Sequence, residues 1–257
     1  MENNFTFITG YTNLQNHETR KNTKTVDDYL KHSIPLFKSG MPIVFYCQKD
    51  FYYIFDEIMK ECPNVISKTF VVEDFRHNNS RFFKTKLPDN LNKDKDTHWY
   101  LGTILQKVYW MEEVANDNPY NSKYFCWVDI GINHVIHEPS TILRKYLLNI
   151  NSTDIKDRII LPSNGKLEDL DTKINYYNNN FNECLMGGII AGSKEKIIWF
   201  SKKQYEAVNN LIKNDNKITW EINYWLLIVR DNQTNFGLYF SQFNHLILQN
   251  FANYLQL

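Results

Sequence analysis

Short apolar runs alternate along this chain with longer segments whose apolar residues recur every three or four positions. The short runs carry few charges, as strands buried on both faces of a parallel sheet do. The longer segments have the stripe of an amphipathic helix. Strands are therefore expected at residues 5–9, 42–47, 65–72, 124–128, 157–162, 185–192 and 236–240. Helices are expected at about 25–40, 50–62, 98–115, 140–148, 194–213 and 219–229, the last of them capped by Thr219.

This alternation of strands and helices predicts an α/β fold with a mixed, mostly parallel sheet flanked by helices. Two polar segments, 73–97 and 164–182, interrupt the rhythm and are expected to be long loops. The chain length of 257 residues and the hydrophobic content of 43% suit one domain spanning residues 1–257.

The central strand is expected to end at an acid. Residues 124–128 are apolar, Asp129 follows them directly, and Gly131 comes two positions later. Open α/β sheets bind their ligands at the carboxyl ends of strands, so this carboxylate is placed where a ligand would lie. The alternative is that Asp129 caps the next segment or accepts hydrogen bonds from the N–H groups of a turn.

The overall charge narrows the range of partners. The 29 basic and 29 acidic residues balance, which argues against a nucleic-acid binder that relies on a global positive field. The sequence has neither a secretory leader pattern nor an apolar run long enough for a membrane span, so a soluble, cytoplasmic protein is expected. The four cysteines form no metal-ligand spacing and are expected to be reduced thiols, mostly buried: Cys47, Cys62, Cys126 and Cys184.

Other positions carry candidate chemistry beside a plain structural reading. Arg20, in the polar segment 11–24, would contact an anionic ligand or lie in a solvated loop. Lys107 is at the edge of a buried helical stripe, so its ammonium either reaches inward or extends to solvent. The Gly187–Gly188 pair implies a close approach to the backbone, or a bulge. Glu221, in a first helical turn, complements the helix dipole whether or not it has another role.

Taken in order, these segments resemble the bacterial HtrL/YibB-like family of proposed glycosyltransferases. The resemblance rests on the strands at 5–9 and 43–47, the helix with Lys107, the segment 125–132, the run 186–188 and the helix that Glu221 opens. The sharpest match is the Trp-Val-Asp-Ile-Gly segment at 127–131. The resemblance implies a GT-A-like, Rossmann-type sandwich that binds a nucleotide-diphosphate sugar at the strand ends.

The resemblance also implies roles for individual residues. A nucleotide pocket would be lined by Thr9, Gly10 and Tyr11, with Lys107 facing the phosphates. The glycine pair 187–188 would let the sugar or the acceptor approach the backbone. Glu221 would be the general base or a contact to a sugar hydroxyl, and His245 a late metal ligand or a diphosphate contact.

One departure from the family's usual pattern concerns the metal. The common Asp-x-Asp is here Asp129-Ile130-Gly131, so the second carboxylate is missing. A Mn²⁺ or Mg²⁺ ion, a hard ion that prefers oxygen ligands such as the Asp129 carboxylate, would then be held by Asp129 with His245, His134 or His137. Otherwise Lys107 and Arg20 would supply the positive charge without a metal.

Three classes of function follow. The first is a glycosyltransferase that moves a sugar from a nucleotide-diphosphate donor to a hydroxyl of a glycan, protein or lipid. The second is a nucleotide-sugar-binding module without transfer activity. The third is another nucleotide-dependent α/β enzyme, such as a nucleotidyltransferase or phosphohydrolase, although these usually need two clustered carboxylates. The aromatic tail, 239–254, would dock on the core or on a second subunit of a homo-oligomer.

Overall fold

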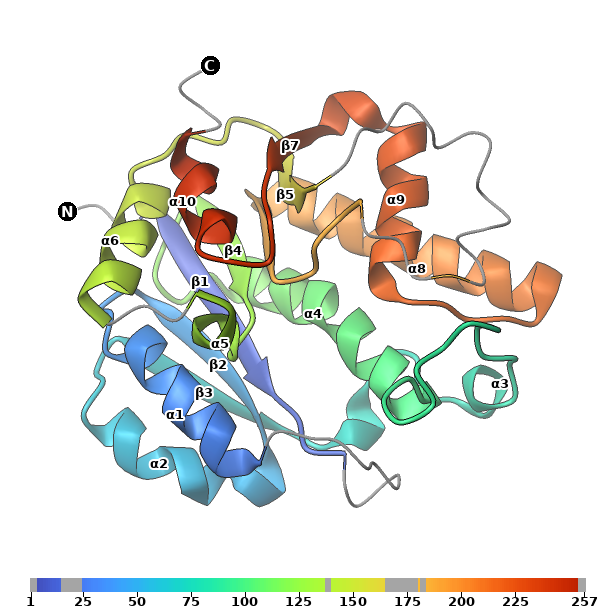
Figure 1. The fold of residues 1–257 in the computed structure, drawn as a ribbon, viewed down its shortest axis with the longest axis horizontal. Coiled ribbons are helices and arrows are strands. Elements are labelled where there is room, and N and C mark those ends of the chain that lie inside the picture. The colour runs from blue at the N-terminus through green and yellow to red at the C-terminus, as the bar shows by residue number, and fades with distance from the viewer. Residues whose placement is uncertain (1–3, 15–24, 137–139, 165–179, 181–183, 254–257) are drawn as a thin grey trace.

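The structure, a computed structural model, describes residues 4–14, 25–136, 140–164, 180 and 184–253. A twisted sheet runs through its centre, with helices on both faces (Figure 1). The order of its seven strands is β3-β2-β1-β4-β6-β5-β7. The strands are β1 Phe5–Tyr11, β2 Ile43–Gln48, β3 Val65–Phe70, β4 Tyr124–Val128, β5 Ile159–Ser163, β6 Ile189–Ser193 and β7 Phe236–Phe240.

Strand β6 is antiparallel to both of its neighbours, β4 and β5, whereas the other neighbouring strands pair in parallel. This sheet confirms the expected fold class, an α/β fold with a mixed, mostly parallel sheet flanked by helices. The helices are α1 Val26–Phe37, α2 Tyr52–Lys60, α3 Ser80–Phe83, α4 His98–Asp117, α5 Ile132–Ile136, α6 Ser140–Asn151, α8 Lys194–Asp215, α9 Glu221–Asp231 and α10 Leu246–Asn253.

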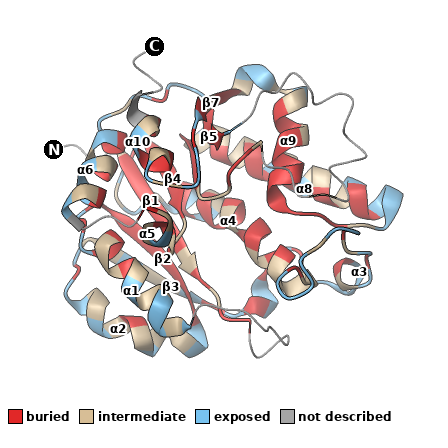
Figure 2. Cartoon of the chain, in the orientation of Figure 1, coloured by how far each residue is buried: buried red, intermediate tan, exposed pale blue. Residues whose placement is uncertain are grey.

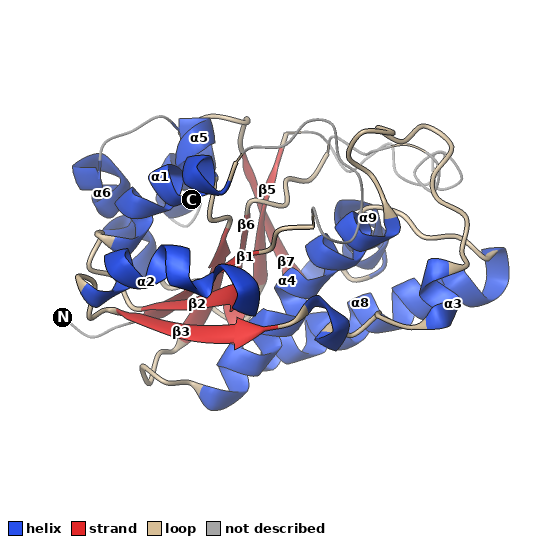
Figure 3. Cartoon of the chain, turned by 90° about the horizontal axis from the view of Figure 1, so that it is seen from below, coloured by secondary structure: helices blue, strands red, loops and turns tan. Residues whose placement is uncertain are grey.

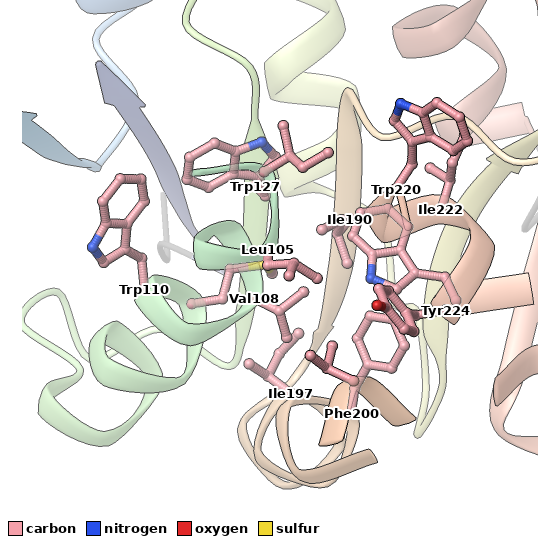
Figure 4. Close-up of a cluster of buried hydrophobic side chains, with 14 of the residues drawn as sticks. Leu105, Val108, Trp110, Trp127, Ile190, Ile197, Phe200, Trp220, Ile222 and Tyr224 are labelled. Atoms are coloured by element: carbon pink, nitrogen blue, oxygen red, sulfur yellow. The ribbon is translucent and has the colours of Figure 1, made fainter. Parts of the chain in front are cut away.

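The helices form two layers, each with its own core. Helices α4, α8 and α9 cover one face of the sheet, and α1, α2, α5, α6 and α10 cover the other (Figure 3). Most strands are therefore buried on both faces, as Figure 2 shows, which explains their uninterrupted apolar runs. The first core is rich in large aromatic side chains between the sheet, α4, α8 and α9 (Figure 4).

Several predicted boundaries were wrong. The strand expected at 185–192 begins only at Ile189, because the two glycines form a turn before it. Helix α9 is capped by Trp220 rather than Thr219, whose hydroxyl instead accepts a hydrogen bond from the Asn223 side chain at 2.7 Å. Helix α5 and the one-turn helix α3, inside the expected loop 73–97, are too short to show a helical period.

The described structure agrees with the expected state of the cysteines. All four are free, and Cys47, Cys62 and Cys126 are buried. Burial raises the pKa of Cys47 to about 12, which makes this thiol unreactive at neutral pH. Among the described residues, no helix combines the length and the apolar character that crossing a membrane requires.

A buried histidine joins the loop after β3 to α4. His77 is 3% exposed, and its Nε2 lies 2.7 Å from the hydroxyl oxygen of Tyr109. Its ring stacks on Phe82 and Tyr205, and the Arg76 guanidinium lies 4.3 Å from the centre of the Tyr109 ring. Burial, and then the charge of Arg76, lower the pKa of His77 to about 4.

This pKa predicts a loss of stability in mild acid. The imidazole stays neutral in the folded protein down to about pH 4, whereas the unfolded chain takes up the proton near pH 6.5. The contribution of His77 is therefore complete above pH 6.5 and falls between pH 6.5 and 4, by at most about 3 kcal/mol. Urea unfolding across this range tests it, with His77→Gln as the matched variant. A loss just as large in that variant would contradict this assignment.

Candidate active site

A cavity of about 370 Å³ opens where the sheet reverses its strand order. After β1 the chain continues to β2 on one side, and β4 pairs with the other side of β1. Ligands of open α/β sheets bind at such a switch point, beyond the carboxyl ends of the strands. The walls come from the end of β1, the turn after β4, the glycine pair before β6, one face of α4 and the start of α9.

Asp129 lies at the wall of this cavity, directly after the buried strand β4. Its side chain is 40% exposed. Its Oδ1 accepts a hydrogen bond from the Trp127 indole N–H at 2.6 Å and lies 3.1 Å from Lys107 Nζ. The described partners of the carboxylate are therefore side chains, not the backbone N–H groups that a capping role requires.

Lys107 reaches inward from α4, the first of its two predicted alternatives. Its side chain is 11% exposed, and its Nζ lies 3.1 Å from Asp129 Oδ1 and 3.4 Å from Glu221 Oε1. The same ammonium donates a hydrogen bond to the carbonyl oxygen of Gly187 at 3.0 Å. It also lies 6.0 Å from the centre of the Trp127 ring, within the range of a cation–π contact.

Burial alone would lower the pKa of Lys107, because it disfavours the charged form. The carboxylates of Asp129 and Glu221 more than offset this effect, so the pKa of Lys107 is raised. The ammonium therefore stays charged at neutral pH. Lys107, Asp129 and Glu221, together called the Lys107 cluster, have a formal net charge of −1.

Glu221 is the first residue of α9, and its side chain is only 8% exposed. Its carboxylate lies at the positive end of the dipole of α9 and also lines the cavity. The glycine pair makes room for it. A Cβ atom at Gly187 would lie 2.6 Å from Glu221 Oε1, and one at Gly188 would lie 3.8 Å from Asp129 Oδ2.

The predicted nucleotide-binding residues are only partly brought together. Gly10 and Tyr11 line the cavity, and Gly10 also leaves space for Trp110, since a Cβ there would lie 2.6 Å from the indole. Thr9 is 1% exposed and does not line the cavity. Its hydroxyl has no hydrogen-bond partner within the described part of the chain. Arg20 lies outside the described residues.

The predicted metal ligands do not converge among the described residues. His245 is exposed and does not line the cavity, and His134 is also exposed, with its ring near that of His32. His137 lies outside the described residues. Over the ranges that the structure describes, no three His, Cys, Asp or Glu side chains gather as a metal site would need. The described positions of Asp129, His134 and His245 therefore do not fit the predicted carboxylate–histidine site for a divalent ion.

Sequence reasoning missed several residues of the cavity wall. On α4, Tyr100 and Thr103 share a face with Lys107 and Trp110, at the spacing of successive helical turns. Trp127 precedes Asp129 by two positions, so period-two alternation would have placed both on one face. Lys95, Trp220 and Phe243 come from connecting segments, where no periodicity could reveal them: all three line the cavity.

The lack of space for a side chain at Gly187 gives a testable prediction about stability. Gly187→Ala should destabilise the fold by about 1–3 kcal/mol, because the new methyl group would push Glu221 away from the buried ammonium. Gly188→Ala should cost less than about 1 kcal/mol, since a Cβ there meets the flexible end of Ile247 at 3.2 Å. Chemical denaturation measures both.

A double-mutant cycle tests whether displacement of Glu221 causes the loss of stability in Gly187→Ala. Combined with Glu221→Ala, Gly187→Ala should cost less than it does alone, with a coupling of about 1 kcal/mol. Equal costs for the two glycine variants, or additive effects in the cycle, would contradict the proximity of Gly187 and Glu221.

The protein is distantly similar to several solved structures. Mouse xyloside xylosyltransferase 1 in its apo form is 8% identical, with 91% of this chain and 84% of that chain covered and a TM-score of 0.46. The 4-diphosphocytidyl-2C-methyl-D-erythritol synthase of Anaerococcus prevotii is 11% identical, with 98% of this chain and 96% of that chain covered and a TM-score of 0.40. TM-scores this low carry no argument about function.

Sequence comparison is more decisive. No curated protein matches the sequence significantly. A family described as "Bacterial protein of unknown function (HtrL_YibB)" matches residues 47–248, which include Lys107, Asp129 and Glu221. Because this match spans most of the chain, the protein belongs to the HtrL_YibB family.

Proposed function

We propose that the protein is a glycosyltransferase that moves a sugar from a nucleotide-diphosphate donor to a hydroxyl acceptor. The observation that carries this proposal is the Lys107 cluster in the wall of a cavity at the β1/β4 switch point. The cavity can hold a small polar ligand, and its wall combines a buried cation, a partly exposed acid and a buried acid. Sugar transfer needs these kinds of group.

Breaking the bond between the sugar and the diphosphate leaves negative charge on the diphosphate. A preorganised cation stabilises that charge most where water is excluded. Lys107 is held in position by three oxygen atoms, and Lys95 adds a second ammonium at the cavity wall. Lysine is a point charge that suits phosphate oxygens. These two residues are therefore proposed to face the diphosphate.

The acceptor hydroxyl must lose its proton as the new glycosidic bond forms. Glu221 faces the cavity, and its carboxylate can take that proton as a general base. Asp129 is proposed to hold Lys107 and Trp127 in position and to offer its second oxygen to a sugar hydroxyl. The aromatic side chains of Tyr11 and Tyr29, which line the same cavity, supply apolar surface for the base and ribose.

Two measurements test the assignment of Glu221 as the base: binding of the donor, and turnover of the donor by a Glu221 variant. A cognate nucleotide-diphosphate sugar should raise the melting temperature, because it binds only the folded state. Glu221→Gln should bind it within a few-fold of the wild type, yet lower transfer and donor hydrolysis by about 10²–10⁴-fold.

Glu206→Gln is the matched control, because the half-exposed Glu206 on α8 does not line the cavity, and it should leave turnover unchanged. If no UDP-, GDP-, CDP- or dTDP-sugar shifts the melting temperature, the proposal fails. Binding without any turnover in the wild type would instead favour a binding module.

An exposed aromatic residue at the cavity predicts an acceptor contact. Phe243 is 59% exposed and lines the cavity, whereas Phe240 is 60% exposed and does not line it. An aromatic ring can stack on the C–H face of an acceptor sugar. Phe243→Ala should raise the KM for the acceptor by about 3- to 10-fold, with donor hydrolysis unchanged.

Phe240→Ala is the control because it removes an equally exposed ring. It should change the acceptor KM by less than about 2-fold, the effect expected of a surface residue away from the site. Equal effects of the two variants would contradict an acceptor contact at Phe243.

A further inference from the structure

The ammonium of Lys107 lies among three oxygen atoms from three separate segments. They are Asp129 Oδ1 after β4 at 3.1 Å, Glu221 Oε1 at the start of α9 at 3.4 Å and the carbonyl oxygen of Gly187 at 3.0 Å. An ammonium has three N–H donors. The number of donors thus equals the number of oxygen atoms around the nitrogen, and the three segments meet at a single cation.

A hard divalent ion prefers the same all-oxygen set of ligands. Here the ammonium of Lys107 occupies the position between these oxygen atoms. Oxygen ligands of Mg²⁺ lie at about 2.0–2.1 Å, whereas the three oxygen atoms lie 3.0–3.4 Å from Nζ, at the distances of ion-pair and hydrogen-bond contacts to an ammonium. For an ion to enter, the ammonium would have to leave a place where its side chain is only 11% exposed. Such a displacement leaves a buried charge unpaired, which is costly.

We propose that Lys107 is the built-in cation of this site and that no divalent ion binds between Asp129 and Glu221. The role of Lys107 toward the diphosphate rests on the proposed glycosyltransferase function, whereas the exclusion of the ion does not. The contact to Glu221 is the longest of the three. A phosphate oxygen that replaces it would keep the ammonium paired and free Glu221 to act as the base.

The test measures melting temperatures with and without Mn²⁺, in the absence of any nucleotide. The Mn²⁺-induced shift should be the same in the wild type and in Asp129→Asn, because the wild type offers no ion site at this carboxylate. Lys107→Met leaves two carboxylates without their cation. This variant should gain a shift of about 5 °C at a Mn²⁺ concentration 100-fold above its dissociation constant.

Two further variants serve as controls. Lys107→Arg keeps a cation in place and should gain no shift, and Lys107→Met/Glu221→Gln retains one carboxylate and should lose the gain. The wild type and Asp129→Asn decide the matter even where Lys107→Met does not fold. A wild-type shift that disappears in Asp129→Asn would overturn the proposal, and so would a folded Lys107→Met variant that does not respond to Mn²⁺.

A second readout separates this inference from the proposed function. With a donor that the wild type turns over, the rate in EDTA should equal the rate in Mn²⁺ within about 2-fold, because an absent ion cannot supply the roughly 10²–10³-fold typical of an electrostatic catalytic group. A transfer rate that EDTA abolishes and Mn²⁺ restores would overturn the proposal that Lys107 is the built-in cation of this site. If the protein turns over no donor, the glycosyltransferase proposal fails, while the melting comparison still decides whether Lys107 excludes the divalent ion.

Discussion

The buried ammonium of Lys107 is the constraint on which the rest of the site depends. A charge this deeply buried is stable only when it is paired and its donors are satisfied. Meeting that requirement places Asp129 at the end of β4 and Glu221 at the start of α9 within 3.1 and 3.4 Å of the same nitrogen. It also requires a glycine at position 187, where a side chain would displace Glu221.

The direction of β6 explains how these segments meet. In the parallel strands β1 and β4, the carboxyl ends face the cavity. Because β6 is antiparallel to β4, its amino end lies at the same edge, and the glycine turn before it passes beside Asp129. The backbone N–H of Asp129 donates to the Gly188 carbonyl at 3.0 Å, which fixes the two turns together. Helix α4 then supplies the cation across this edge.

The sequence predicted the strands well because burial on both faces makes them uninterrupted apolar runs. It also placed Asp129 and Glu221 at element ends, where ligands bind. It could not decide whether Lys107 points inward, since that depends on two acids distant in sequence. The exposure of His245 was equally hidden, because it depends on how the segment before α10 crosses the surface. The prediction that Thr219 caps α9 was wrong because its hydroxyl accepts a hydrogen bond from the buried Asn223 side chain rather than from a backbone N–H of the helix.

A crystal structure with a bound nucleoside diphosphate tests the central claim most directly. The account predicts the diphosphate in the cavity at the β1/β4 switch point, with a phosphate oxygen within about 3 Å of Lys107 Nζ. The contradicting result is a diphosphate bound elsewhere, for example in the second cavity of about 440 Å³ beside Lys68, while Lys107 keeps all three of its protein contacts.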